Sequence, residues 1–223
     1  MTVKLFFEAV IKFLLGVALV GVLIFLPAGT FAYIYGWIFM GVLFVPMLIV
    51  GIVMMVKNPA LLASRLKAKE SKKGQGVLIK LSGLMFIAGF ILAGLDFRFG
   101  WLPIPPRVSY VSTAVFLFGY LLFAEVLREN AYLSRTIRVE QGQTVVDTGL
   151  YSVVRHPMYT ATLILFLSMP LVLGSVIALP VFCLYPVLII FRIKGEEKLL
   201  EAELIGYTEY KKKTKYRLIP YVW

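Results

Sequence analysis

Long apolar runs are the feature that most constrains how this chain can fold. Of its 223 residues, 60% are hydrophobic, and its mean hydropathy is +0.88. Four runs, at about 5–26, 34–56, 77–95 and 108–127, approach or exceed the roughly 20 apolar residues needed to cross a bilayer. The sequence therefore predicts an all-α integral membrane protein.

A further apolar region, residues 158–193, is too long for a single span. Gly174-Ser175 lies near its middle, with Pro170 before it and Pro180 after it, and these residues favour a turn. We therefore expect the region to form two spans in a tight hairpin, which gives about six transmembrane helices. One domain should cover residues 1–223, with a four-helix membrane part at 1–127 and a functional part at 128–223.

The positive charges lie where they would orient a membrane protein. The net charge is +11, and most loop Lys and Arg residues fall in segment 57–76, in the segment after residue 127 and in the tail. The opposite loops hold Arg98 and Arg107. By the positive-inside rule, both termini should be cytoplasmic. This placement favours a membrane surface over nucleic acid as the partner of the basic residues.

The C-terminal tail, residues 194–223, becomes polar again. Leu200, Leu204 and Tyr207 recur at helical spacing among charged residues, which predicts a short amphipathic helix. We expect Gly206 to interrupt or end that helix. Cys183 is the single cysteine, so neither an intrachain disulfide nor a cysteine metal site is expected.

Polar residues concentrate at 148–159, directly before the apolar hairpin. His156 is the single histidine, and Arg155 and His156 stand before Pro157, which suits the first turn of a helix. Both side chains should therefore lie at a helix start near the water–lipid boundary. A basic anchor at the interface would explain the same pattern.

Arg192 and Glu196 form a second candidate site. They are four residues apart, so they share a helix face if the last span continues into the tail. Ionisable groups at the end of an apolar run are costly and often functional. The alternative is an ordinary ion pair worth a few tenths of a kcal/mol. A metal site is not expected, because the carboxylates are scattered and there is no second histidine.

Several of these motifs together resemble the isoprenylcysteine carboxyl methyltransferase family. They are residues 148–151, residues 155–159, Arg192 with Glu196-Glu197, and residues 206–210. Segments 94–101 and 216–223 resemble its prokaryotic members, so the similarity covers nearly the whole chain. Order, spacing and position on one side of the membrane make the set specific.

The resemblance implies a methyltransferase of a prokaryotic cytoplasmic membrane that uses S-adenosyl-L-methionine and has its active site on the cytoplasmic side. Glu196 would hold the amino group of the cofactor and Arg192 would face the substrate, which makes these two the expected catalytic residues. Many family members have a histidine where this chain has Gln143. The expected cofactor-binding residues are Gln143, Thr144, Val145, Val146, Tyr151, Arg155, His156, Pro157, Met158, Tyr159, Glu196 and Glu197.

The expected acceptor is lipophilic and carries a carboxylate, such as a prenylated cysteine or a related lipid. A carboxylate is already deprotonated, so the reaction needs orientation of two charged partners rather than a general base. Other acceptors, including a phospholipid amine, stay open. A membrane sterol-type reductase that uses NADPH has a similar Arg-His-Pro-x-Tyr stretch, with asparagine where this chain has Met158. A scaffold without enzymatic activity is the third alternative.

Overall fold

The computed structural model describes residues 3–66, 73–133, 139 and 141–223. Lys67, Lys69, Glu70 and Lys72, which belong to the expected basic loop, lie outside the described residues. The described part of the chain is helical and contains no strand, apart from one isolated bridge between Pro103 and Ser175. Its helices are α1 Val3–Ala28, α2 Ile34–Lys57, α3 Pro59–Leu66, α4 Lys73–Phe99, α5 Pro106–Glu129, α6 Leu150–Val153, α7 Pro157–Val172, α8 Leu179–Phe182, α9 Tyr185–Glu203 and α10 Tyr207–Lys213.

Four of these helices are long and apolar enough to cross a membrane. They are α1, α2, the part of α4 from Gln75 to Phe99, and α5, and they match the four apolar runs of the sequence. The prediction of an all-helical membrane protein is therefore confirmed. The count of six stays a prediction, because α7 has 16 residues and the second half of α9 is charged.

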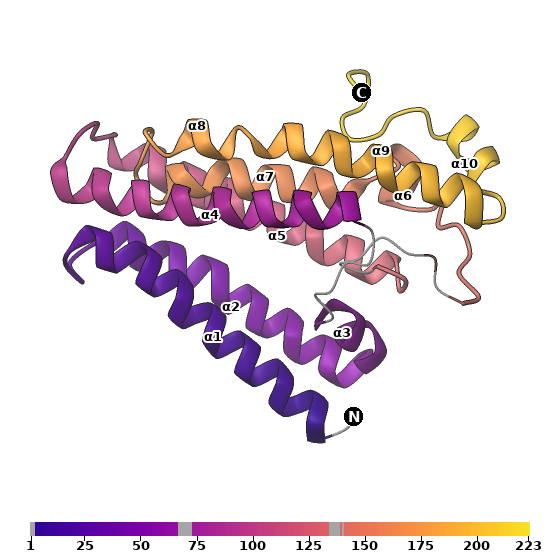
Figure 1. The fold of residues 1–223 in the computed structure, drawn as a ribbon, viewed down its shortest axis with the longest axis horizontal. Helices are drawn as coiled ribbons and strands as arrows, with labels where there is room; N and C mark the ends of the chain where they lie inside the picture. Colours follow the sequence, from indigo (N-terminus) through magenta and orange to yellow (C-terminus); the bar gives the residue numbers. More distant parts are fainter. Residues whose placement is uncertain (1–2, 67–72, 134–138, 140) are drawn as a thin grey trace.

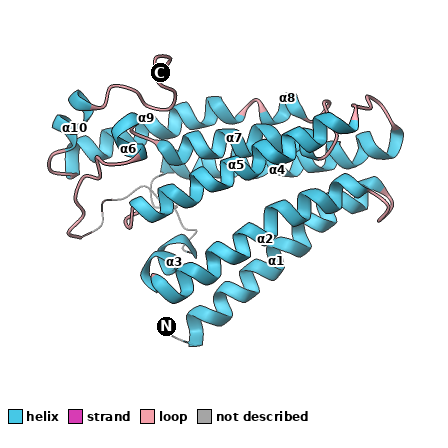
Figure 2. Ribbon diagram, turned by 180° about the vertical axis from the view of Figure 1, so that it is seen from behind, coloured by secondary structure: helices cyan, strands magenta, loops and turns pink. Residues whose placement is uncertain are grey.

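The long helices alternate in direction, so both chain ends and several short helices lie at the same end of the molecule. In Figures 1 and 2, α1 and α2 form an antiparallel pair that diverges from the other helices toward the N-terminus. Both chain ends, together with α3, α6 and α10, lie at one end of the helices. The two termini therefore lie at a common end of the molecule, and their cytoplasmic orientation stays a prediction.

The expected turn at the middle of the last apolar region is confirmed. Helix α7 ends at Val172, and Gly174 takes a positive φ of 76°, which glycine adopts without steric cost. Ser175 Oγ then donates a hydrogen bond to Asp96 Oδ2 at 2.6 Å, and Leu102 N donates to Asp96 Oδ1 at 3.1 Å. The buried Asp96 carboxylate thus ties the turn and the loop after α4 to the end of α4.

The expected amphipathic helix of the tail is divided between the end of α9 and α10. Helix α9 continues without a break from Tyr185 to Glu203, so residues 194–203 prolong the last apolar helix. The chain leaves the helix at Leu204, Gly206 takes a left-handed conformation with φ 86°, and α10 starts at Tyr207. The interruption at Gly206 is therefore confirmed. The tail forms the end of one helix and the whole of another.

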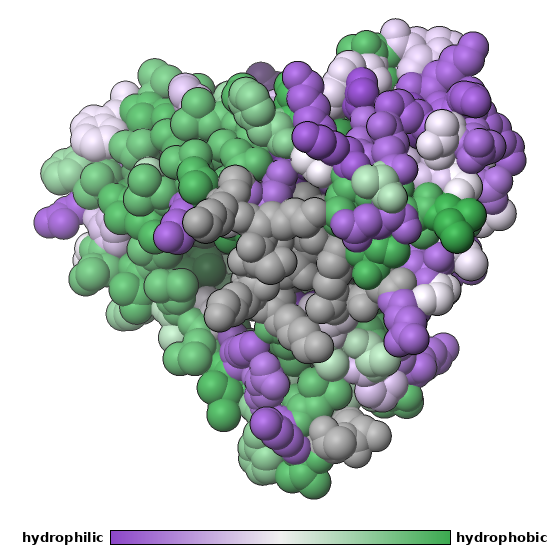
Figure 3. Space-filling model, turned by 45° about the vertical axis from the view of Figure 1, so that its right-hand side comes forward, coloured by the Kyte–Doolittle hydropathy of each residue, from purple (hydrophilic) through white to green (hydrophobic). Residues whose placement is uncertain are grey.

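The interior is aromatic and the exterior of the long helices is apolar. Phe39, Phe116 and Phe182 are fully buried at the centre of the main cluster of packed side chains. Leu14, Leu121 and many similar residues stay exposed on α1, α2 and α5, as expected for helices that face lipid. In Figure 3, apolar side chains cover much of the face in view, and hydrophilic ones gather toward the end that carries α10. That polar end holds the candidate site.

Candidate active site

The start of α7 is built from the Arg155-His156-Pro157 sequence. His156 is the N-cap residue and Pro157 is the first helical residue, where its missing N–H costs no intrahelical hydrogen bond. Arg155 N donates to the carbonyl oxygen of Tyr216, and His156 N donates to that of Arg217, both at 2.9 Å. The expected helix start is confirmed, and the C-terminal tail pairs with the chain directly before it.

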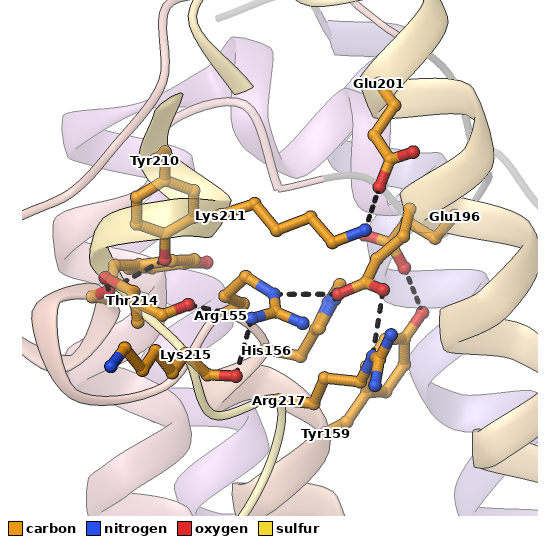
Figure 4. A network of polar contacts seen from close by, with 12 residues as sticks. Arg155, His156, Tyr159, Glu196, Glu201, Tyr210, Lys211, Thr214, Lys215 and Arg217 are labelled. Carbon is orange, nitrogen blue, oxygen red and sulfur yellow. Dashed lines mark hydrogen bonds and ion pairs between the residues drawn. The ribbon is translucent and has the colours of Figure 1, made fainter. Parts of the chain in front are cut away.

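Glu197 on α9 is the centre of an ion-pair network beside this helix start. Its carboxylate accepts hydrogen bonds from Arg155 Nε at 2.8 Å and Arg217 Nε at 2.9 Å, and His156 Nε2 lies 3.3 Å from Oε1. Figure 4 shows Arg155, His156 and Arg217 close to one another. Burial raises the pKa of Glu197, but hydrogen bonds from His156, Arg155 and Arg217 outweigh it and lower the pKa to about 2. Glu197 is therefore ionised at neutral pH.

Arg155 also binds the tail through a second nitrogen atom of its guanidinium. Its Nη1 donates to the carbonyl oxygens of Thr214 at 2.7 Å and Lys215 at 2.8 Å (Figure 4). Arg217, which shares Glu197 with Arg155, places its guanidinium over the ring of Trp223 at 5.1 Å. Arg155 and Glu197 thus hold the last ten residues of the chain against the start of α7.

Tyr159 connects Arg192 and Glu196. Its hydroxyl donates to Glu196 Oε2 at 2.6 Å and accepts a hydrogen bond from Arg192 Nε at 3.1 Å. Arg192 and Glu196 lie one turn apart on α9, so both face α7. The structure brings the two candidate sites of the sequence together, and a tyrosine hydroxyl joins them.

The turn of α9 that carries this pair packs closely on the start of α4. Gly195 lies between Arg192 and Glu196, and a Cβ atom at this position would lie 2.0 Å from Gln75 Nε2. A side chain at position 195 would therefore displace the end of the flexible Gln75 side chain.

The chain turns sharply before α6, and this turn positions Tyr151. Gly149 has φ 52° and ψ −127°, a conformation that residues with a side chain rarely adopt. A Cβ atom there would lie 1.6 Å from Glu129 Oε1. The Glu129 carboxylate accepts the N–H of Leu150 at 3.1 and 3.0 Å, and Asn130 Nδ2 donates to the Tyr151 hydroxyl at 2.9 Å. The end of α5 thus shapes the start of α6.

Most residues of the predicted site line one cavity among the described residues. Eleven predicted residues line it: Gln143, Thr144, Val145, Val146, Tyr151, Arg155, His156, Met158, Tyr159, Arg192 and Glu196. The two that do not are Pro157, which starts α7, and Glu197, whose hydrogen bonds described above go to protein groups. The cavity is therefore bounded by α9, by the start of α7 and by segment 143–151.

The cavity also has walls that the sequence interpretation did not assign. These additional lining residues are Asn130, Tyr132, Leu133, Leu200, Leu204, Tyr207 and Tyr210. Tyr207 and Tyr210 belong to the segment 206–210 that carried part of the family resemblance, so this motif was the available signal. Nothing in the pattern after α5 indicated the first three, which reach the cavity because segment 143–151 folds back beside them.

Two tyrosines of α10 differ in how their hydroxyl groups are satisfied. The Tyr210 hydroxyl donates to the carbonyl oxygen of Tyr151 at 2.7 Å. The Tyr207 hydroxyl is buried and has no hydrogen-bond partner among the described residues. Because buried polar groups nearly always have a partner, the Tyr207 hydroxyl points to a ligand.

The lining suits a ligand that carries both charge and aromatic surface. Glu196 offers a carboxylate for a cation, Arg192 offers a planar guanidinium for a carboxylate, and several tyrosine rings offer flat apolar faces. Over the described part of the chain, no three His, Cys, Asp or Glu side chains gather closely enough to hold a metal ion. The site is therefore equipped to position charged organic groups.

Comparison with known proteins agrees with this chemistry. Residues 111–202 match the model of the Isoprenylcysteine carboxyl methyltransferase (ICMT) family. The matched region runs from α5 to α9 and includes the start of α7, Arg192 and Glu196. No curated protein matches the chain significantly.

Proposed function

We propose that the chain, of which residues 111–202 match the isoprenylcysteine carboxyl methyltransferase family, transfers a methyl group from S-adenosylmethionine to a lipophilic acceptor. The family points to methyltransferase activity, and the apolar helices point to a membrane protein. The observation that carries the finer proposal is the arrangement of Arg192, Tyr159 and Glu196 along one wall of the cavity.

The residues of the cavity fit S-adenosylmethionine. Glu196 would accept hydrogen bonds from its ammonium group, and the rings of Tyr132 and Tyr151 would lie against its adenine or near its positive charge. The buried, unpaired hydroxyl of Tyr207 supports a ligand with acceptor oxygens. When bound, the cofactor supplies an electrophilic methyl group on a positively charged sulfur.

The protein's own residues would then orient the acceptor. Arg192 would bind the acceptor carboxylate, for which its planar fork of N–H donors is suited. Tyr159 accepts a hydrogen bond from Arg192 and donates one to Glu196, so it keeps the acceptor group and the cofactor group in a fixed relation. An ionised carboxylate gives up no proton, which supports a mechanism of orientation and exclusion of water rather than base catalysis.

The position of the site supports an acceptor that enters from the bilayer. The cavity lies where α7 and α9 leave the apolar part of the molecule, so a lipid chain can stay among the helices while its polar end reaches Arg192. A prenylated cysteine or a related lipid acid has this form. We further propose that the site and both termini face the cytoplasm, because the basic segments share that end.

Calorimetric titration of the purified protein tests the proposal. We expect S-adenosylhomocysteine to bind and NADPH not to bind, because the pair on α9 suits an ammonium and a carboxylate. Binding of NADPH alone would instead identify a sterol-type reductase. Binding of neither would leave a scaffold without enzymatic activity.

A further inference from the structure

Tyr207 is the most conspicuous polar group of the cavity whose partner is missing. It is the first residue of α10, it is 3% exposed and it lines the cavity. Its hydroxyl has no hydrogen-bond partner among the described residues. An unpaired buried hydroxyl destabilises the protein without a ligand, so its retention calls for a role when a ligand is present.

The neighbouring Tyr210 shows that α10 can satisfy a tyrosine within the protein. Tyr210 lies three residues further along the same helix, is 6% exposed, and donates its hydroxyl hydrogen to the carbonyl oxygen of Tyr151. Both tyrosines are thus buried beside the same cavity, but Tyr210 is paired. The missing partner of Tyr207 is therefore a property of that position rather than of the helix.

The charges around Tyr207 identify it as a hydrogen-bond donor. Burial, followed by the negative charges of Glu197 and Glu196, raises the pKa of Tyr207 far above its ordinary value, while the positive charge of Arg155 opposes this. The phenol therefore keeps its proton at neutral pH. The same charges show that the Tyr207 side chain lies within electrostatic reach of Glu196 and of Arg155.

We propose that the Tyr207 hydroxyl donates a hydrogen bond to the carboxylate of the methionine part of the cofactor. The inference rests on the proposed function, in which Glu196 holds the ammonium group. The ammonium and the carboxylate are attached to the same carbon, so a donor near Glu196 is also near the carboxylate. Arg155, which also lines the cavity, places a positive charge within electrostatic reach of the Tyr207 hydroxyl.

The test compares Tyr207→Phe with Tyr210→Phe, using S-adenosylhomocysteine and its decarboxylated analogue as calorimetric ligands. Tyr207→Phe should weaken binding of S-adenosylhomocysteine about 10- to 100-fold, the value of one hydrogen bond to a charged group. Its affinity for the decarboxylated analogue should stay within about twofold of the wild-type value. Tyr210→Phe, which loses an internal hydrogen bond, should change both affinities by the same factor.

Thermal unfolding without ligand gives an independent readout. Tyr207→Phe should leave the melting temperature unchanged or raise it, because it removes an unpaired buried hydroxyl, whereas Tyr210→Phe should lower it. Equal loss of affinity for both ligands, or no loss for either, in Tyr207→Phe overturns the inference while the proposed function stands. Wild-type protein that binds neither ligand overturns both.

Discussion

Glu196 and Glu197 are adjacent in the sequence, but their side chains have different surroundings. Glu197 accepts hydrogen bonds from Arg155 and Arg217, which hold the tail. Glu196 accepts one from Tyr159 and lines the cavity. Consecutive residues of a helix point about 100° apart, so the sequence could identify the acidic pair but could not divide its tasks. We expect Glu196 to meet the ligand and Glu197 to hold the protein together.

Arg192→Lys and Glu196→Gln should separate acceptor binding from cofactor binding. Arg192→Lys keeps the charge but loses the planar fork, so turnover should fall at least 10-fold while the cofactor dissociation constant changes little. Glu196→Gln should raise that dissociation constant about 10- to 100-fold. Calorimetry and methyl-transfer assays of both variants measure the two effects.

If Arg192 and Glu196 formed only an exposed ion pair, neither substitution would have a large effect. Such pairs contribute about 0–1 kcal/mol, so both substitutions would be nearly silent. The matched control is Lys211→Gln, which removes an exposed pair with Glu201 on the same end of the molecule. If Arg192→Lys and Glu196→Gln behave like this control, the proposed active centre is wrong.

Glu197 should make the stability of the protein depend on acidic pH. Its pKa is lowered from 4.5 to about 2 in the folded protein, so the unfolded chain binds its proton at higher pH. The stabilisation is then fully present above about pH 4.5 and is lost as the pH falls toward about 2. Melting temperatures between pH 7 and pH 3 should therefore fall less steeply for Glu197→Gln than for wild type.

Glu197→Gln should also destabilise the protein at neutral pH. Removing one partner from a buried ionic network costs about 3–5 kcal/mol, because the remaining charges lose their counter-ion. Glu201→Gln provides the control, since Glu201 forms an exposed pair with Lys211 and should cost at most about 1 kcal/mol. Identical pH profiles for wild type and Glu197→Gln would show that Glu197 does not stabilise the fold as we describe.

The helices that are apolar along their whole length were the most predictable elements. The four long apolar helices match their runs within a few residues at each end, because continuous hydropathy identifies a membrane helix. Helix α9 begins apolar and ends charged, so the sequence indicated a short amphipathic helix in the tail, whereas residues 194–203 continue the last apolar helix. The helix start at Pro157 and the break at Gly206 were correct, because both depend on local backbone chemistry.

The turn before α6 should tolerate no side chain. Gly149→Ala must place a Cβ atom at positive φ and against Glu129, so we expect a loss of stability of at least about 1–3 kcal/mol. The displaced Glu129 would also release the N–H of Leu150, and cofactor affinity should fall because Tyr151 moves. Thermal unfolding and calorimetric titration measure the two effects.

Gly100 supplies the control for this substitution. It also has a positive φ, 61°, but nothing lies within 4 Å of a Cβ atom built there. Gly100→Ala should therefore show the backbone strain alone and leave ligand affinity unchanged. If Gly149→Ala costs no more than Gly100→Ala, the Glu129 contact does not shape the site.

At the scale of the whole molecule, the class of fold was predictable but the assembly of the cavity was predictable only in part. Apolar side chains lie both inside and on the lipid-facing surface, so hydropathy identifies the helices without ordering them. The cavity walls come from the residues just after α5, segment 143–151, α7, α9 and α10. Asn130, Tyr132 and Leu133 also line it, and no periodicity of the sequence indicates this.

The orientation of the molecule in the membrane can be tested with an impermeant thiol reagent. In a background where Cys183 is replaced by alanine, Thr30→Cys and Leu102→Cys should react in intact cells, because their loops lie at the end opposite α10. A cysteine placed after Trp223 should react only after the membrane is opened. Labelling of that C-terminal cysteine in intact cells would reverse the proposed orientation.

The most direct test of the central claim is methyl transfer itself. Purified protein is incubated with membrane lipids and S-adenosylmethionine that carries a labelled methyl group, and the lipid extract is then treated with alkali. We predict a labelled lipid that releases labelled methanol, as a carboxyl methyl ester does, and we predict that Arg192→Lys forms much less of it. A label that resists alkali, or the absence of labelled lipid with the wild-type protein, would contradict this account.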